Sequence, residues 1–170
     1  MKVYYKGRVD SLVEESAIVK GKRVRITVIK ERDAVTILPL LGNDRILLES
    51  QYRPVVRKRL YELPAGHIEK GETPIKAVKR ELREEAGYST KLIRFMFNAY
   101  SQPNTVTTML HFYYAHCYRS GEPEPEALED INIRIVSLSK ALDMIKRNEI
   151  RDTKSIAAIL YYVNFELVRK

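Results

Sequence analysis

The segment Gly66–Tyr88, GHIEKGETPIKAVKRELREEAGY, decides the fold of this 170-residue chain. Its second half carries three glutamates, Glu81, Glu84 and Glu85, in a strongly helical stretch. With 3.6 residues per turn these three positions fall on one face of a helix. Like charges so close together repel by about 0.2–0.5 kcal/mol per pair, which a purely structural helix would avoid. The acidic face therefore indicates a site for hard divalent cations, above all Mg²⁺ or Mn²⁺.

The same segment contains signals that bound a helix. Thr73 is a good N-cap, Pro74 suits the first helical position, and Gly87 can adopt the left-handed conformation that ends a helix. The alternative is a solvated helix with excess acid, but the basic residues of the segment already supply solubility. An apolar stripe on the opposite face predicts that the helix packs on a core, through Ile75, Val78, Leu82 and Ala86.

The composition is that of a soluble globular protein, with 45% hydrophobic and 31% charged residues. No apolar run approaches the roughly 20 residues of a membrane span, and the N-terminus lacks a signal-peptide pattern. A single cysteine, Cys117, excludes an internal disulfide and favours a reducing compartment, so we expect a cytoplasmic protein. The net charge of +8 suits capture of a small anionic ligand. The basic residues form no dense block, so nucleic-acid binding is not expected.

Alternation of apolar and polar residues predicts two structural parts. Residues 1–32 read as three strands with a hairpin turn at Gly21, which form a small antiparallel sheet. Such a sheet is not stable alone and must pack on the rest of the chain or on a partner. Residues 33–170 interleave strands with the acidic helix and end in two more helices. This order predicts an α/β (α+β) sandwich, with helices on both sides of a mixed sheet.

The segment at Gly66 resembles the Nudix box, the signature of hydrolases that cleave nucleoside diphosphates linked to another moiety. Tyr88 stands where an aliphatic residue is usual, a departure that affects packing rather than chemistry. The resemblance rests on eight positions with the spacing of the box: Gly66, Glu72, Arg80, Glu81, Leu82, Glu84, Glu85 and Gly87.

Flanking motifs extend the resemblance to the ADP-ribose pyrophosphatase subgroup. They are QYR at Gln51–Arg53, ELPAG at Glu62–Gly66, NEIRDTKSIAAIL at Asn148–Leu160, and Pro103. The resemblance implies Mg²⁺-dependent hydrolysis of ADP-ribose to AMP and ribose 5-phosphate. Asn104 and Thr108 depart from the subgroup pattern, which leaves the sugar open. There are two alternatives. The protein is a hydrolase of another nucleoside diphosphate sugar, or it is a non-catalytic module that senses a nucleotide.

The resemblance also implies a role for each site residue. Two or more metal ions would be held by Glu81, Glu85 and the carbonyl of Ala65, while Glu84 completes the shell or orients water. Glu129, in an acidic loop at 119–130, is the expected base. Glu124 and Glu126 are the fallback candidates.

The remaining roles concern the substrate and the frame around the metals. Arg53 is the expected pyrophosphate ligand, because an arginine fork matches phosphate geometry. Glu62, in the ELPAG motif, is expected at the substrate. Four box residues are expected to support the site: Gly66, Glu72, Arg80 and Gly87.

The resemblance further implies a homodimer. In this subgroup an N-terminal sheet is exchanged between two copies. We therefore expect residues 1–32 to be a dimerisation extension and residues 33–170 to be the hydrolase domain.

Overall fold

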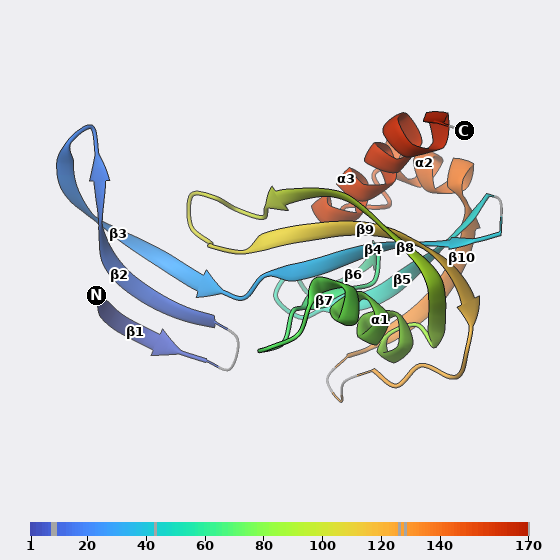
Figure 1. Cartoon of the computed structure of the whole chain (residues 1–170), viewed down its shortest axis with the longest axis horizontal. Helices are drawn as coiled ribbons and strands as arrows, with labels where there is room; N and C mark the ends of the chain where they lie inside the picture. The colour runs from blue at the N-terminus through green and yellow to red at the C-terminus, as the bar shows by residue number, and fades with distance from the viewer. Residues whose placement is uncertain (8–9, 43, 126, 128, 170) are drawn as a thin grey trace.

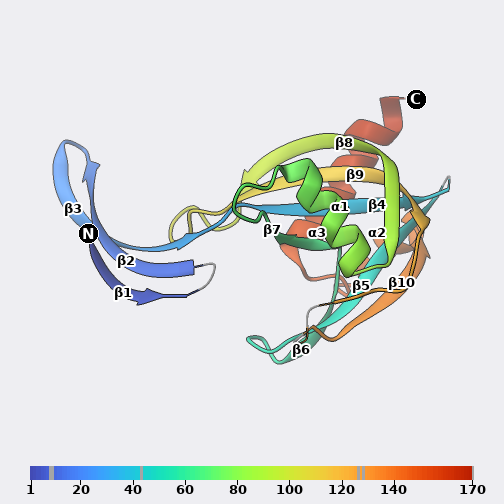
Figure 2. The same cartoon turned by 60° about the horizontal axis from the view of Figure 1, so that its bottom comes forward.

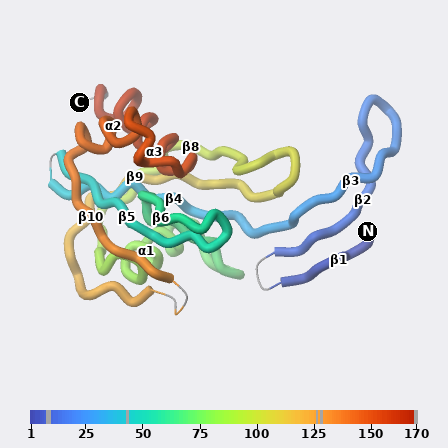
Figure 3. Tube along the Cα trace, turned by 180° about the vertical axis from the view of Figure 1, so that it is seen from behind, coloured from blue at the N-terminus to red at the C-terminus, as the bar shows by residue number. Residues whose placement is uncertain are grey.

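Two β-sheets and a set of helices form the protein, whose structure is a computed structural model (Figure 1). The structure describes residues 1–7, 10–42, 44–125, 127 and 129–169. Three antiparallel strands form the N-terminal sheet, in the order β1-β2-β3. Their bounds are β1 Lys2–Lys6, β2 Asp10–Val19 and β3 Lys22–Glu31. This sheet stands to one side of the remaining structure and is joined to it through the end of β3 (Figure 3).

The hairpin between β2 and β3 turns at the predicted position. Lys20 and Gly21 have φ angles of 50° and 73°, the two consecutive left-handed residues that a tight two-residue turn requires. Val19 pairs with Lys22 directly across the turn. The antiparallel sheet predicted for the N-terminal segment is thereby confirmed.

The second sheet is mixed. Its main path runs in the order β10-β5-β4-β9-β8, with β4 and β9 parallel and the other pairs antiparallel. Two short strands pair off this path, β6 with β5 and β7 with β4. The bounds are β4 Ala34–Leu41, β5 Arg45–Arg53, β6 Lys58–Glu62, β7 Ala65–His67, β8 Tyr88–Tyr100, β9 Met109–Arg119 and β10 Ile131–Ser137.

Helices cover both faces of the mixed sheet, which confirms the predicted sandwich (Figure 1). Helix α1, Pro74–Glu84, packs on one face, over Val35 and Ile37 of β4 (Figure 2). Helices α2, Leu138–Lys146, and α3, Thr153–Tyr161, pack on the other face. Helix α3 continues into a π-helical turn, Tyr162–Glu166, and a 3₁₀ turn, Leu167–Arg169. No helix of the described residues is long and apolar enough to cross a membrane.

Helix α1 begins as predicted, and three of the four residues of the predicted apolar stripe are buried: Val78, Leu82 and Ala86. Thr73 caps it, and its side chain accepts a hydrogen bond from the backbone N–H of Lys76. Ile75 is 41% exposed rather than part of the buried stripe. Glu81 and Glu85 are instead buried beside Leu82 and Ala86. The acidic face and the apolar face therefore overlap, and two of the glutamates point into the protein.

Candidate active site

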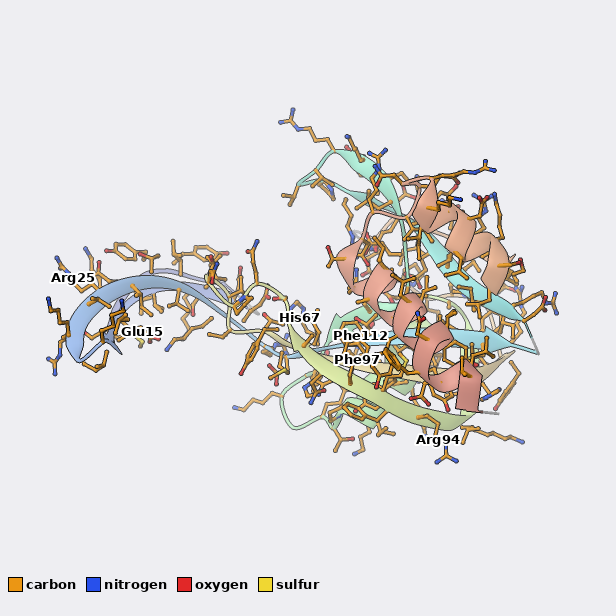
Figure 4. All side chains as sticks on the ribbon, turned by 90° about the horizontal axis from the view of Figure 1, so that it is seen from above. Glu15, Arg25, His67, Arg94, Phe97 and Phe112 are labelled. Carbon is orange, nitrogen blue, oxygen red and sulfur yellow. The ribbon has the colours of Figure 1, made fainter. Side chains whose placement is uncertain are left out.

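A pocket of about 460 Å³ opens where α1, β7 and the start of β4 meet. His67, on its rim, lies at the junction between the N-terminal sheet and the sandwich (Figure 4). Charged side chains of both signs converge on it from segments far apart in the sequence. They are Arg32, Arg53, Glu69, Arg80, Glu81, Glu84, Glu129 and Lys154.

Arg80 organises the acidic side of the pocket. Its Nη1 donates to Glu81 Oε1 at 2.7 Å and to Glu84 Oε2 at 3.3 Å. Its Nε and Nη2 donate to the two oxygens of Glu72, at 3.1 and 3.0 Å. Nη2 also donates to the backbone carbonyl of His67 at 2.8 Å. One guanidinium thus ties three box glutamates to the loop before α1.

Gly66 makes room for the Glu81 carboxylate. A Cβ atom at position 66 would lie 1.9 Å from Glu81 Oε1 and 2.3 Å from its Cδ, so only glycine permits this approach. Burial raises the pKa of Glu81 to about 7, although its ion pair with Arg80 opposes the shift. Glu81 is therefore held in a dry position where it binds a cation or a proton readily.

Glu85 lies deeper still, and a backbone group holds it. Its Oε2 accepts a hydrogen bond of 3.0 Å from the backbone N–H of Ala65. Burial, followed by the nearby carboxylates of Glu49 and Glu81, raises the pKa of Glu85 well above its usual value. This accumulation of buried acid is what a bound cation would neutralise.

Glu49 is a site residue that the sequence motifs did not indicate. It lies on β5, is 1% exposed, and its Oε1 has no hydrogen-bond partner among the described residues. Burial raises its pKa to about 8, and the charges of Glu62 and Glu129 add to the shift. The sequence does contain a signal for Glu49, which is a single acid directly after the buried apolar run Ile46–Leu48.

Glu62 accepts hydrogen bonds from two basic side chains that line the pocket, Arg53 and Lys154. Arg53 donates Nε and Nη2 to its two oxygens, both at 2.8 Å, and Lys154 Nζ donates to Oε2 at 2.5 Å. Although burial opposes it, these hydrogen bonds lower the pKa of Glu62 to about 2. Lys154 also pairs with Asp152, the N-cap of α3, at 3.0 Å. Lys154 was not among the expected site residues, although it lies within the NEIRDTKSIAAIL motif.

The acidic loop at 119–130 is fastened at both ends. The backbone N–H groups of Ser120 and Gly121 donate to Gly87, and that of Glu124 donates to the Glu84 carbonyl at 2.8 Å. Gly87 has a φ of 72°, and a Cβ there would lie 2.6 Å from the Gly121 carbonyl oxygen. Glycine at this position therefore permits both the left-handed end of the helix and the close approach of the loop.

At its other end the loop places Glu129 in the pocket. Asp130 accepts hydrogen bonds from the backbone of Tyr52 and from the Arg59 side chain. Glu129 lines the pocket, and its charge contributes to the raised pKa values of Glu81 and Glu85. Of the two fallback candidates, Glu124 is exposed and Glu126 lies outside the described residues.

The donor atoms match a hard divalent cation in chemistry. Carboxylate oxygens and a backbone carbonyl are the ligands that Mg²⁺ and Mn²⁺ prefer. Among the described residues no three acidic, histidine or cysteine side chains already stand close enough together to hold an ion. The reason is visible in two hydrogen bonds, because Glu81 is turned onto Arg80 and Glu85 onto the Ala65 N–H. Cation binding would exchange these bonds for metal ligation.

Comparison with known proteins agrees with this chemistry. The family model described as the NUDIX domain matches residues 30–159, most of the chain. The chain belongs to the Nudix family. Nudix hydrolases generally use divalent metal ions, and an ADP-ribose pyrophosphatase is similar to the chain over nearly its full length. The protein is accordingly a Nudix pyrophosphohydrolase.

Three relatives show the range of the similarity. An ADP-ribose pyrophosphatase of Bacillus subtilis (strain 168) is 31% identical over 155 residues, covering 90% of this chain and 84% of the relative. A methanol dehydrogenase activator of Bacillus methanolicus is 29% identical over 160 residues, covering 92% and 86%. A GDP-mannose pyrophosphatase of Escherichia coli O1:K1 / APEC is 34% identical over 106 residues, covering 61% and 55%.

Proposed function

We propose that this Nudix protein hydrolyses the pyrophosphate bond of ADP-ribose to AMP and ribose 5-phosphate, with Mg²⁺ as cofactor. One juxtaposition carries the proposal: the acidic face of α1 and the cationic wall of Arg53 and Lys154 line the same pocket. A pyrophosphate bound by these basic side chains on one side, and by metal ions that the carboxylates would hold on the other, would be positioned for attack by water. The Bacillus subtilis relative, an ADP-ribose pyrophosphatase, supports the choice of substrate.

The carboxylates divide the work on the metal side. When bound, the divalent cations neutralise the pyrophosphate and lower the pKa of the attacking water. Glu81, Glu85 and the Ala65 carbonyl would hold two or more Mg²⁺ ions, or Mn²⁺ in their place. Glu84, which Arg80 holds at 3.3 Å, completes the shell or orients the water. Glu129, which lines the pocket, is the proposed general base that would accept the proton of that water.

On the opposite wall Glu62 acts on the substrate through the cations that it holds. Arg53 uses Nε and Nη2 on Glu62, which leaves its Nη1 as the donor for a phosphate oxygen. Because Glu62 fixes the guanidinium plane in advance, Arg53 loses little side-chain entropy when the substrate binds. Glu62 also positions Lys154 beside it.

A second nucleoside diphosphate sugar is the main alternative substrate. The relatives that are GDP-mannose pyrophosphatases favour it. Thr108, one of the two departures from the subgroup pattern, is buried and donates its hydroxyl to Glu31 of β3. The loop that the resemblance assigns to the sugar is thus bound to the N-terminal sheet. A sensing module without catalysis is less well supported, because Glu81, Glu84 and Glu85 are all present.

A substrate panel tests the proposal. The protein is incubated with Mg²⁺ and ADP-ribose, ADP-glucose, GDP-mannose or NADH, and the products are separated by chromatography. The expected result is the highest kcat/KM for ADP-ribose, with AMP and ribose 5-phosphate formed in equal amounts. A higher kcat/KM for GDP-mannose would establish the alternative substrate. Tight binding of ADP-ribose without turnover would overturn the enzymatic proposal.

We further propose that residues 1–32 form a dimerisation extension of a hydrolase domain at 33–170. The small sheet exposes apolar side chains that its own three strands cannot cover: Val3, Tyr4, Tyr5, Ile18, Val19 and Ile26. We propose that a second copy of the chain covers these side chains in a homodimer. Separately, the single cysteine is consistent with a cytoplasmic protein. A variant lacking residues 1–32 is expected to sediment as a monomer, and a folded dimer of that variant would contradict the proposal.

A further inference from the structure

Arg32 lines the pocket, and its guanidinium has no hydrogen-bond or ion-pair partner among the residues that the structure describes. It lies between β3 and β4 and lines the pocket together with Ala34 and Gly66. Its Nε is buried and has no hydrogen-bond acceptor among the described residues. Its side chain makes no ion pair or hydrogen bond elsewhere in that part of the chain. A buried guanidinium N–H without an acceptor is disfavoured unless a ligand supplies one.

The other pocket cations are all engaged by carboxylates. Arg53 forms its fork with Glu62, and Lys154 binds Glu62 as well. Arg80 is divided among three box glutamates. Within the described residues Arg32 is therefore the pocket cation whose whole guanidinium is available to an anion from outside the chain.

We propose that Arg32 binds the diphosphate of the substrate, as a ligand additional to Arg53. This inference rests on the proposed function, since it assumes a substrate with a central diphosphate. A guanidinium offers parallel N–H donors that match two oxygens of a phosphate. Arg32 enters from the β3–β4 junction, whereas Arg53 enters from the end of β5, so the two arginines bind the diphosphate from different segments.

The position of Arg32 also explains how a two-part substrate is accommodated. Arg32 and Glu69 line both the active-site pocket and an adjacent cavity of about 630 Å³. The second cavity is bounded by Asp33, Ile68 and His111, among others. A diphosphate held at Arg32 lies where one half of the substrate can pass into this neighbouring space. Because Arg32 contacts the diphosphate, its contribution is the same for every nucleoside diphosphate sugar that the enzyme accepts.

Arg32→Gln tests the inference, with Arg94→Gln as the matched control. Arg94 is exposed on β8, and Figure 4 shows it on the far side of the sandwich from His67. Both variants lose one positive charge, so the net charge of the protein falls equally in the two. Steady-state kinetics with ADP-ribose and GDP-mannose are measured at one ionic strength, and Arg32→Lys is measured alongside.

We expect Arg32→Gln to raise KM about tenfold or more for both substrates, with kcat changed less than about threefold. Arg32→Lys should lie between wild type and Arg32→Gln, because it keeps the charge but not the fork. The affinity of a non-hydrolysable methylene analogue of ADP-ribose, measured by calorimetry with Mg²⁺, should fall by the same factor as KM rises. The melting temperature of Arg32→Gln should not decrease, since the arginine makes no bond within the described protein.

The outcomes separate the two proposals. If wild type turns over the panel and Arg32→Gln has the KM of Arg94→Gln, the role of Arg32 is wrong and the proposed function stands. A lower melting temperature with unchanged affinity would identify Arg32 as structural and also overturn the inference. If wild type hydrolyses no nucleotide of the panel, the proposed function fails, and the inference fails with it.

Discussion

The active-site pocket and the N-terminal sheet depart from an ordinary protein surface in opposite directions. Beneath the pocket lining, the carboxylates of Glu49 and Glu85 are only 1% and 3% exposed. In the sheet, apolar side chains such as Val3, Tyr5 and Ile18 are 50–66% exposed. Acids are normally outside and large apolar side chains inside. In the proposals above, a cation would neutralise the acids of the pocket and a second copy of the chain would cover the sheet.

The two departures differ in cost. Burying a carboxylate disfavours its charged form strongly, so the pocket strains the protein until protons or cations neutralise it. Exposing an apolar side chain only forgoes the free energy of burial, about 1.5–3 kcal/mol for a large residue. Substitutions in the two regions should therefore be detected by different measurements. Changes in the pocket should alter turnover and pH dependence, whereas changes in the sheet should alter association.

Glu85→Gln should have the largest effect. It removes a metal-ligating charge while keeping the hydrogen bond from the Ala65 N–H, so the fold should be retained. Loss of several kcal/mol of transition-state stabilisation corresponds to a fall in kcat of about a hundredfold or more. Steady-state kinetics with Mg²⁺ measure the loss, and circular dichroism checks the fold.

Glu124→Gln is the matched control for Glu85→Gln. It makes the same chemical change at an exposed position outside the pocket, and its interaction with Glu84 uses only the backbone N–H. We expect wild-type turnover. If Glu85→Gln hydrolysed normally, the metal assignment would be wrong, and if Glu124→Gln were inactive, the base would lie at Glu124 rather than Glu129.

Gly66→Ala should have the next largest effect. The new Cβ would meet Glu81 Oε1, the mobile end of a side chain, so the carboxylate moves while the backbone stays. Displacement of one metal ligand should lower kcat by about tenfold to a hundredfold with little change in melting temperature. Gly121→Ala is the control, because nothing lies within 4 Å of its added Cβ. Normal kcat for Gly66→Ala would show that Glu81 does not need this position.

Several features of the pocket and of the N-terminal sheet could be predicted from the sequence, because they depend on residues that are close together in the chain. Thr73 and Pro74 fix the start of α1 through bonds within one turn, and Gly21 fixes the N-terminal hairpin through its own backbone. The spacing of the box likewise gathers Glu81 and Glu85, since a helix alone determines that they are neighbours. Such features survive whatever the rest of the chain does.

Contacts made across the fold could not be predicted in this way. Glu49 approaches Glu85 only because β5 packs against the end of the box segment, where Leu47 and Ala86 share a core cluster. Arg32 enters the pocket only because the β3–β4 junction passes it. Strand β6 was missed because its sequence is mostly charged and its pairing with β5 defines it. Helical periodicity also placed Ile75 inside, although its position in the first turn of α1 leaves it exposed. These features depend on tertiary packing, which no local pattern encodes.

Glu49→Gln should change stability rather than turnover as its primary effect. With a pKa raised from 4.5 to about 8, Glu49 keeps its proton in the folded protein at pH values where the unfolded chain releases it. The free energy of unfolding should therefore decrease as pH rises from 4.5 toward 8. In EDTA at pH 8 the variant should melt about 2–4 °C higher than wild type, and the two should converge near pH 4.5.

Glu149→Gln, which removes an exposed carboxyl group, controls for the loss of charge. It should leave the pH dependence of the melting temperature unchanged. If Glu49→Gln melted below wild type at pH 8, the buried carboxylate would be a stabilising group. The description of the pocket as a strained region would then be wrong.

Ile18→Ser should have the smallest effect on the protein itself, and it tests the other half of the comparison. Ile18 is 66% exposed, so in a monomer its replacement should change the free energy of unfolding by less than about 0.5 kcal/mol. If a second copy covers the sheet, loss of its buried area should weaken the dimer about tenfold or more, as sedimentation equilibrium would measure. Ile135→Ser, 44% exposed on β10 of the mixed sheet, should leave association unchanged. If Ile18→Ser and Ile135→Ser had the same dimer dissociation constant, the N-terminal sheet would not be the dimer surface. Its apolar side chains would then simply be exposed to solvent.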